Sequence, residues 1–171
     1  MMKKDNKVVL EILKQAMESE KDGYEFYIQA STITKDPKGK EMFKYLARDE
    51  TEHFKTLEDA YNRLKGGEGK GSNTIGHKQK EKGFLIDSSL LLKVDSGDLK
   101  ALNIAMKIEE DAQEFYAKSA EKAKQSDIRD IFLKLSDMEK NHYNLLKYEH
   151  DSLIRSGFWC DFPEITIEET E

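Results

Sequence analysis

Apolar and polar positions follow the 3.6-residue period of amphipathic α-helices in four stretches of the chain. In each stretch, apolar side chains recur at spacings of three and four, as in helices that pack one face against a core. We therefore predict four helices, at about residues 6–33, 37–65, 98–124 and 127–156. With only two prolines and many Glu and Lys residues, the composition also favours long helices and an all-α fold.

Residues that commonly begin and end helices stand at these bounds. Asp36 can cap the second helix, and Pro37 suits its first turn. Two glycines at 66–67 can end that helix. Ser126 can cap the fourth helix, and Gly157 can end it.

The sequence contains an internal repeat. When the chain is shifted by 89 positions, residues 16–65 align with residues 105–154 without a gap, and 14 of the 50 aligned positions are identical. Average residue usage would give roughly three identities by chance. We therefore interpret the chain as two copies of one helical hairpin.

Residues 66–97 connect the two hairpins. The first part of this connection is polar and rich in glycine, and the second part contains the apolar run FLIDSSLLLKV. A helix of thirty residues is about 45 Å long, and a connection of this length can cross from one end of a bundle to the other. The alternative, a linker between independent hairpins, is disfavoured because a lone hairpin buries little surface. We predict one domain over residues 1–171, a four-helix bundle with a tail at 157–171.

Four glutamates interrupt the apolar seams that should face the core. One lies in each predicted helix: Glu20, Glu50, Glu109 and Glu139. Burying an unpaired carboxylate costs several kcal/mol, and four carboxylates close together would also repel one another. A compensating positive charge is therefore expected between the helices.

Histidines follow two of these glutamates at a spacing of three. His53 follows Glu50, and His142 follows Glu139 at the equivalent repeat position. Because residues three apart share a helix face, each pair can direct an oxygen and an imidazole nitrogen to one point. A buried Glu–His hydrogen-bond network is the alternative interpretation.

The two remaining glutamates, Glu20 and Glu109, belong to the same level of the bundle. Counted outward from the predicted turns near residues 35–36 and 125, each of them lies as far along its helix as the Glu-x-x-His pair of the same hairpin. Four carboxylates and two divalent cations then balance in charge when the histidines are neutral. A glutamate from each of two helices and Glu-x-x-His from each of the other two is the known pattern of di-iron and di-manganese carboxylate sites.

Tyr27 and Tyr116 follow the glutamates of the first and third helices by seven residues, on the same face. They can hydrogen-bond the ligand carboxylates from outside the metal site, or they can be plain core aromatics. The sequence leaves both interpretations open.

Charge and cysteine content exclude several other classes. The net charge of −6 argues against nucleic acid as the main partner. The single cysteine, Cys160, excludes an intrachain disulfide and a four-cysteine metal centre. The N-terminal sequence predicts neither a signal peptide nor a membrane span, so we expect a cytoplasmic location.

Four segments resemble the ligand helices of rubrerythrins, a branch of the ferritin-like superfamily. They are EKDGYEFY at 20–27, DETEH at 49–53, EEDAQEFY at 109–116 and MEKNH at 138–142. The resemblance implies a ferritin-like bundle with two iron ions per chain, in a cytoplasmic protein that reduces hydrogen peroxide and is commonly a homodimer. It implies that the ligands are Glu20, Glu50, His53, Glu109, Glu139 and His142.

The sequence departs from the rubrerythrin pattern in two respects. Many rubrerythrins carry a rubredoxin domain with four cysteines, so we expect this chain to take electrons from a separate protein such as a rubredoxin. Typical members also have a seventh carboxylate one turn after the ligand of the third helix. That position is Ala112 here, and its repeat equivalent is Gly23. The expected site therefore has six ligands and approximate two-fold symmetry.

These observations favour a non-haem di-iron oxidoreductase that acts on peroxide or dioxygen. Manganese fits the same ligands. One alternative is a ferroxidase or iron-handling protein with the same site. Another is a non-enzymatic bundle in which the metal only stabilises the structure.

Overall fold

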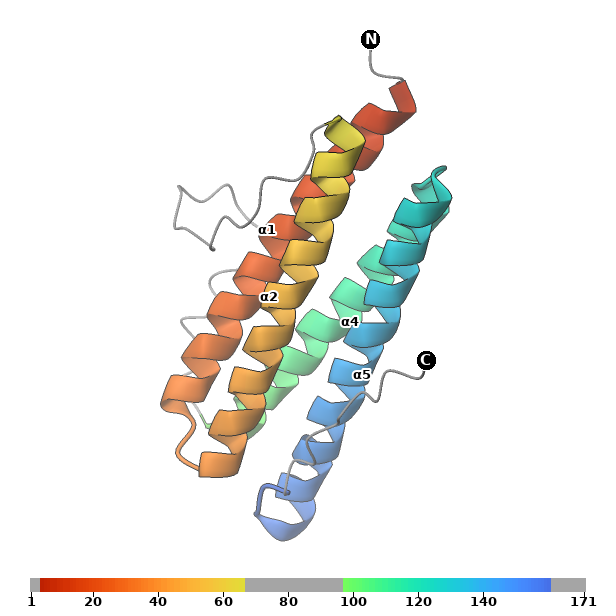
Figure 1. The fold of residues 1–171 in the computed structure, drawn as a ribbon. Coiled ribbons are helices and arrows are strands. Elements are labelled where there is room, and N and C mark those ends of the chain that lie inside the picture. Colours follow the sequence, from red (N-terminus) through yellow and green to blue (C-terminus); the bar gives the residue numbers. More distant parts are fainter. Residues whose placement is uncertain (1–3, 67–96, 161–171) are drawn as a thin grey trace, which may run out of the picture.

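The computed structural model describes residues 4–66 and 97–160, and within these residues the chain forms four helices and no strand (Figure 1). In chain order they are α1 (Lys4–Ile33), α2 (Pro37–Lys65), α4 (Asp98–Lys122) and α5 (Ser126–Ser156). The predicted all-α four-helix bundle is confirmed.

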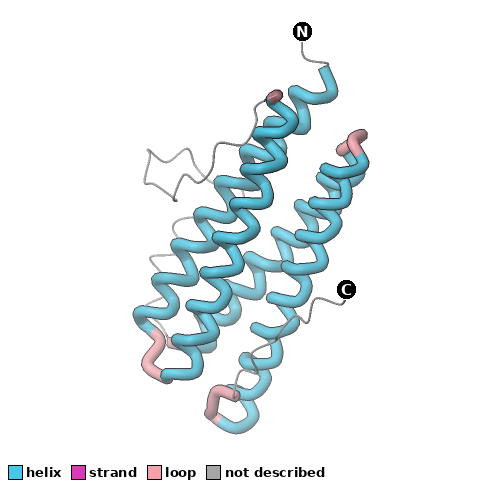
Figure 2. Tube along the Cα trace, viewed as in Figure 1, coloured by secondary structure: helices cyan, strands magenta, loops and turns pink. Residues whose placement is uncertain are grey.

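The helices pair as two hairpins that lie side by side (Figure 2). α1 packs along α2, and α4 packs along α5. The end of α2 and the start of α4 lie at opposite ends of the bundle, as a one-crossover bundle requires (Figure 1). The connecting residues 67–96 of the predicted crossover lie outside the described residues.

The observed helix ends agree with several of the predicted signals. The Asp36 side chain caps α2 by accepting a hydrogen bond from the Lys38 N–H, over 2.8 Å. α2 ends at Gly66, where φ is 87°, and α5 ends at Gly157, where φ is 75°. Both values lie in the left-handed region, which glycine adopts without the steric cost of a Cβ atom.

Three predicted helix ends were wrong by one or two residues. α1 begins at Lys4 instead of residue 6, and α4 ends at Lys122 instead of residue 124, because Ala123 already has extended backbone angles. Ser126 is the first residue of α5 and not its cap. Gln125 takes the cap position and makes no side-chain capping bond. Such small shifts are common because individual end contacts contribute little free energy.

The core consists of two apolar clusters, one on each side of the predicted glutamate and histidine layer. The repeat is visible in both clusters. Tyr27 stacks on Phe43 with ring centroids 6.2 Å apart, and Tyr116 stacks on Phe132 at 6.1 Å. The layer is therefore closed off from solvent above and below by packed aromatic and aliphatic side chains.

Residues 157–160 fold back over one end of the bundle. Trp159 is only 5% exposed, and its ring meets Phe43 edge-on with centroids 5.9 Å apart. Its indole N–H donates to Asp98 Oδ2 over 3.0 Å, and the Cys160 N–H donates to Glu149 Oε2 over the same distance. These contacts join the C-terminal end of α5 to the starts of α2 and α4.

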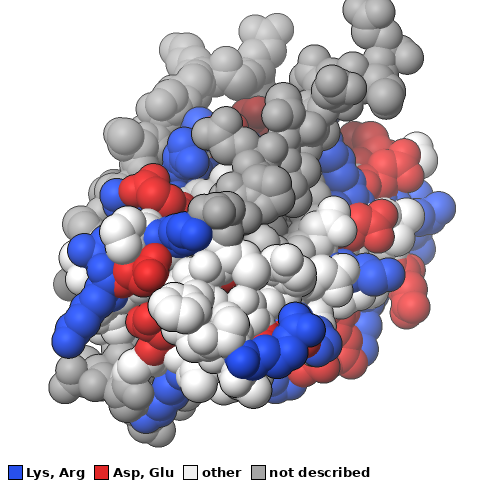
Figure 3. All heavy atoms as spheres, turned by 90° about the horizontal axis from the view of Figure 1, so that it is seen from below, with Lys and Arg blue, Asp and Glu red and all other residues white. Residues whose placement is uncertain are grey.

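The same end of the molecule has a broad uncharged surface with charged side chains around it (Figure 3). Ile154 and Phe158, near the end of α5, are among the exposed hydrophobic residues. None of the described helices has the length and hydropathy needed to span a membrane.

Candidate metal centre

Every helix contributes to a charged layer in the middle of the bundle. α1 and α4 each supply one glutamate, and α2 and α5 each supply a Glu-x-x-His pair. Because i and i+3 share a helix face, both residues of each pair point inward. The six predicted ligands are all no more than 4% exposed: Glu20, Glu50, His53, Glu109, Glu139 and His142.

The structure brings these six residues together as two overlapping groups. One group is Glu20, Glu50, His53 and Glu139, and the other is Glu50, Glu109, Glu139 and His142. Within each group the potential ligand atoms lie within 4.8 Å of one another. The glutamates of the two Glu-x-x-His pairs, Glu50 and Glu139, belong to both groups.

The first group converges on the Nδ1 atom of His53. This atom lies 3.1 Å from Glu139 Oε1, 3.3 Å from Glu20 Oε2 and 3.5 Å from Glu50 Oε2. Carboxylate oxygens from three different helices therefore surround one imidazole nitrogen.

The second group repeats this arrangement around His142. Its Nδ1 atom lies 3.1 Å from Glu139 Oε2, 3.7 Å from Glu109 Oε1 and 4.0 Å from Glu50 Oε1. Glu50 and Glu139 thus turn one oxygen toward each histidine. The two imidazole rings stack, with centroids 5.4 Å apart. This is the approximate two-fold symmetry that the sequence repeat predicts.

The two predicted outer tyrosines connect the hairpins. The Tyr27 hydroxyl donates a hydrogen bond to Glu109 Oε1, and the Tyr116 hydroxyl donates to Glu20 Oε1. Each tyrosine therefore orients a glutamate of the other hairpin. Of the two interpretations left open by the sequence, this geometry favours contact with the carboxylates.

Sequence reasoning missed Asp49, which contacts the centre from outside. Its Oδ2 atom lies 3.0 Å from His142 Nε2, on the far side of the ring from the cluster. Asp49 directly precedes Glu50 in the DETEH segment, but the equivalent repeat position is Met138, so the repeat gives no signal for it.

Burial and neighbouring charges shift the pKa values of the carboxyl groups. Burial, reinforced by the charge of Glu139, raises the pKa of Glu109 to about 8. Burial also raises the pKa values of Glu20 and Glu50, with further contributions from neighbouring glutamates. Burial acts in the same direction on Glu139, but the two adjacent histidines outweigh it and hold its pKa below the ordinary value. The cluster therefore needs positive charge, supplied by protons or by bound cations.

Four buried polar atoms without a hydrogen-bond partner indicate whether a metal ion fits between these residues. Glu20 Oε2, Glu139 Oε1 and both ring nitrogens of His53 are buried without a hydrogen-bond partner. Buried polar atoms are normally paired, and three of these four face one another across the first group. A cation ligated by these atoms would satisfy them. A mixed set of carboxylate oxygens and imidazole nitrogens suits iron and manganese.

No further carboxylate enters the layer at the two positions noted in the sequence. A Cβ atom on Gly23 would lie 3.3 Å from Glu50 Cδ, so glycine leaves room for that carboxylate. Ala112, the equivalent residue of α4, is buried. These two positions therefore add no carboxylate to the six predicted residues.

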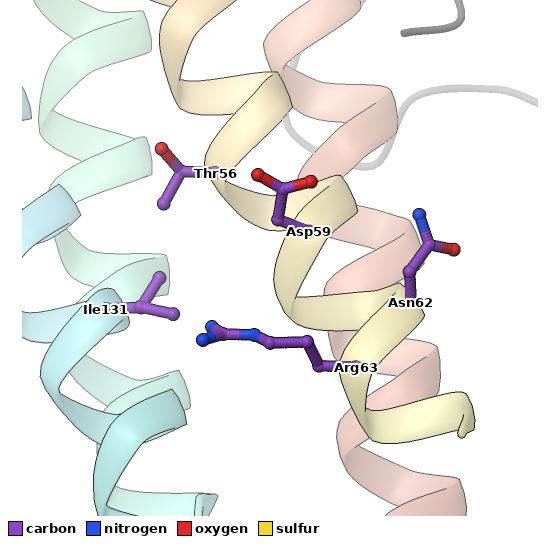
Figure 4. A pocket seen from close by; sticks show the side chains of 5 residues that line it. All are labelled: Thr56, Asp59, Asn62, Arg63 and Ile131. Atoms are coloured by element: carbon purple, nitrogen blue, oxygen red, sulfur yellow. The ribbon is translucent and has the colours of Figure 1, made fainter. Parts of the chain in front are cut away.

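A groove of about 400 Å³ opens between α2 and α5 (Figure 4). On α2 it begins at Thr56, one helical turn beyond His53, and Arg63 extends across it toward Ile131 of α5. Asp59 and Asn62 complete its lining. The groove therefore lies along α2 beyond His53, and four of the five residues that line it are polar.

Comparison with known proteins supports these observations. The family model described as Rubrerythrin matches residues 11–149. The chain is also similar to a solved structure, described as a hypothetical protein from Pyrococcus furiosus, with 26% sequence identity and a TM-score of 0.64. That similarity covers 85% of this chain and 90% of the other. No curated protein is significantly similar to the chain. The match to the Rubrerythrin family model reaches all four helices and includes the six residues of the charged layer. The chain therefore belongs to the rubrerythrin family.

Proposed function

We propose that this protein is a non-haem di-iron oxidoreductase that reduces hydrogen peroxide or dioxygen with electrons from a separate donor. The supporting observation is the pair of overlapping ligand groups that share Glu50 and Glu139 in a buried layer. In this proposal the six predicted residues are the ligands: Glu20, Glu50, His53, Glu109, Glu139 and His142.

The charge and burial of the layer suit this chemistry. Four carboxylates would offset the charge of two divalent ions held by these six residues. Bound iron would supply the electron transfer that the side chains cannot perform. The two apolar clusters exclude bulk water, and Tyr27 and Tyr116 keep their glutamates oriented through hydrogen bonds.

The number of electrons available limits what the proposed centre can do without an external electron donor. Reduction of hydrogen peroxide to two water molecules consumes two electrons and two protons, and reduction of dioxygen to water consumes four of each. A pair of ferrous ions that becomes ferric supplies two electrons. One pair can therefore complete one peroxide reduction, and sustained turnover requires an external donor such as a rubredoxin.

The alternative function is ferroxidase or iron handling, in which Fe(II) is itself the substrate. The observation that favours it concerns two positions beside the layer. Ala112 and Gly23 leave no seventh carboxylate, whereas the resemblance to typical rubrerythrins implies one.

Stopped-flow oxidation of the Fe(II)-loaded protein tests the proposal. We expect two iron ions per chain, one equivalent of peroxide consumed per pair, and further turnover only after a reduced donor is added. Dioxygen at the same concentration should react more slowly. Faster oxidation by dioxygen than by peroxide would instead support the ferroxidase function.

A further inference from the structure

The two halves of the metal centre differ in what lies behind their histidines. The Nε2–H of His142 donates to Asp49 Oδ2 over 3.0 Å, and Asp49 is hydrogen-bonded in turn to Tyr45. This carboxylate keeps the proton on Nε2. With Nε2 held by Asp49, Nδ1 of His142 is the nitrogen that faces the glutamates, 3.1 Å from Glu139 Oε2, and it can bind a metal when its own proton is released.

His53 lacks the equivalent support. It is 1% exposed, and its Nε2 atom has no hydrogen-bond partner. The repeat supplies the reason. The position equivalent to Asp49 is Met138, and a thioether sulfur is only a weak acceptor. Among the described residues, no acidic side chain therefore selects the tautomer in which Nδ1 of His53 is free to bind a metal.

A carboxylate behind a ligating histidine fixes the tautomer of the ring and raises its basicity, and losing such a partner typically costs about 10–100-fold in metal affinity. We propose, on the basis of the metal centre proposed above, that its two positions are unequal. The position formed with Glu109 and His142 binds metal first and tightly. The position formed with Glu20 and His53 binds about 10–100-fold more weakly and exchanges its metal.

The surroundings of the two halves support the same order. The polar groove between α2 and α5 begins at Thr56, one turn beyond His53 (Figure 4). The equivalent positions of the other repeat carry apolar side chains. Thr56 corresponds to Leu145 and Ile131 corresponds to Met42, and both of these equivalents pack in an apolar cluster. The groove therefore lies on the His53 side of the layer, whereas the corresponding positions on the His142 side are apolar.

Titration of the metal-free full-length protein with Mn(II) tests this inference. We expect calorimetry to resolve two binding steps whose dissociation constants differ by at least about tenfold. Electron paramagnetic resonance should detect isolated Mn(II) at one equivalent and a coupled pair only as the second equivalent is added. Two steps of equal affinity, or a coupled pair from the first addition, would overturn the inference.

Exchanging the residues at the equivalent positions 49 and 138 shows which half of the centre gives each binding step. Asp49→Met should weaken the tight step by about 10–100-fold, and Met138→Asp should strengthen the weak step by a similar factor. Asp137→Met, at an exposed neighbouring position of α5, is the charge-matched control and should change neither step. An unchanged tight step in Asp49→Met would overturn the inference.

Two further variants decide the assignment if Met138→Asp does not fold. His53→Ala should retain the tight step, and His142→Ala should lose it. The reverse result would overturn the inference. Binding of one ion or none at saturation in the unmodified protein would contradict the proposed two-metal centre itself, and the inference with it.

Discussion

At the scale of single residues, the central layer is dominated by the cost of burying charge. Burial and the charge of Glu139 raise the pKa of Glu109 to about 8, so this carboxyl group retains a proton at neutral pH when no cation is bound. Its hydroxyl partner Tyr27 comes from the opposite hairpin. The ionised forms of Glu20, Glu50 and Glu109, whose pKa values are raised, are therefore unfavourable for folding until a cation binds.

Replacement of one predicted ligand separates the cost of burying a carboxyl group from the gain on binding a cation. We expect Glu109→Ala to lose metal while its metal-free form remains at least as stable as the unmodified metal-free protein, because a buried carboxyl group is removed. Elemental analysis and thermal unfolding measure the two results. Glu110→Ala is the matched control, since Glu110 is the exposed neighbour. Metal content equal to the unmodified protein in Glu109→Ala would show that the ligand set is wrong.

The outer tyrosines can be tested as a symmetric pair. Tyr27→Phe and Tyr116→Phe each remove one hydrogen bond to a ligand glutamate and leave the ring in the core. We expect each to weaken metal binding by about tenfold or more with little change in the fold, measured by equilibrium dialysis and circular dichroism. Tyr61→Phe, outside the layer, should have no effect on affinity. Equal affinities throughout would mean that the tyrosines are plain core aromatics.

At the scale of elements, the start of α2 and the segment after α5 depend on each other. Gly39 lies beneath Trp159, and a Cβ atom added to it would come within 2.6 Å of the indole ring and 2.7 Å of Thr34 Cγ2. Trp159 also bonds Asp98 at the start of α4. One aromatic side chain therefore links three helices at this end of the bundle.

Gly39→Ala tests this link, because packing and helix propensity predict opposite effects on stability. In an exposed helix interior, Ala stabilises relative to Gly by roughly 0.5–1 kcal/mol. Here we expect a net loss of about 1–3 kcal/mol from overpacking, measured by chemical unfolding. The loss should shrink in a Trp159→Ala background, where part of the clash is absent. A gain in stability from Gly39→Ala alone would contradict the described packing.

At the scale of the whole molecule, the candidate metal centre lies between the two hairpins. Both ligand groups include residues of both hairpins. Metal bound only to the folded state stabilises it by about 2.7 kcal/mol per site at a free concentration one hundred times the dissociation constant. Metal binding and bundle assembly are therefore coupled.

Removal of metal should lower the melting temperature. For a chain of this size, each kcal/mol corresponds to about 2–4 °C, so we expect chelation to lower the melting temperature by roughly 5–10 °C for each site that was filled at that concentration. Differential scanning calorimetry measures the shift. The Glu109→Ala protein is the control, because chelation should leave its melting temperature almost unchanged. An equal shift in both proteins would show that chelation acts elsewhere.

The sequence by itself determined the helices, the repeat and which residues face the core. Helical period and caps are local properties, so the seams that contain Glu20 and Glu109 could be predicted from spacing alone. Helix ends such as Ser126 could not be placed exactly, because the competing end contacts are nearly equal in free energy. The ligand roles of the six residues remain a prediction, whereas their convergence in one buried layer is observed.

Only the tertiary structure decided how the two hairpins meet. Tyr27 bonds a glutamate 82 residues away, and Asp49 lies beside His142 at a separation of 93 residues. Spacing within one helix carries no information on the partner chosen across an interface, because that choice depends on the relative position of two separately formed hairpins. The sharing of Glu50 and Glu139 and the unpaired outer nitrogen of His53 were decided in the same way. The repeat predicts a symmetric centre, and its two halves differ because Asp49, whose repeat equivalent is Met138, contacts His142 across the interface.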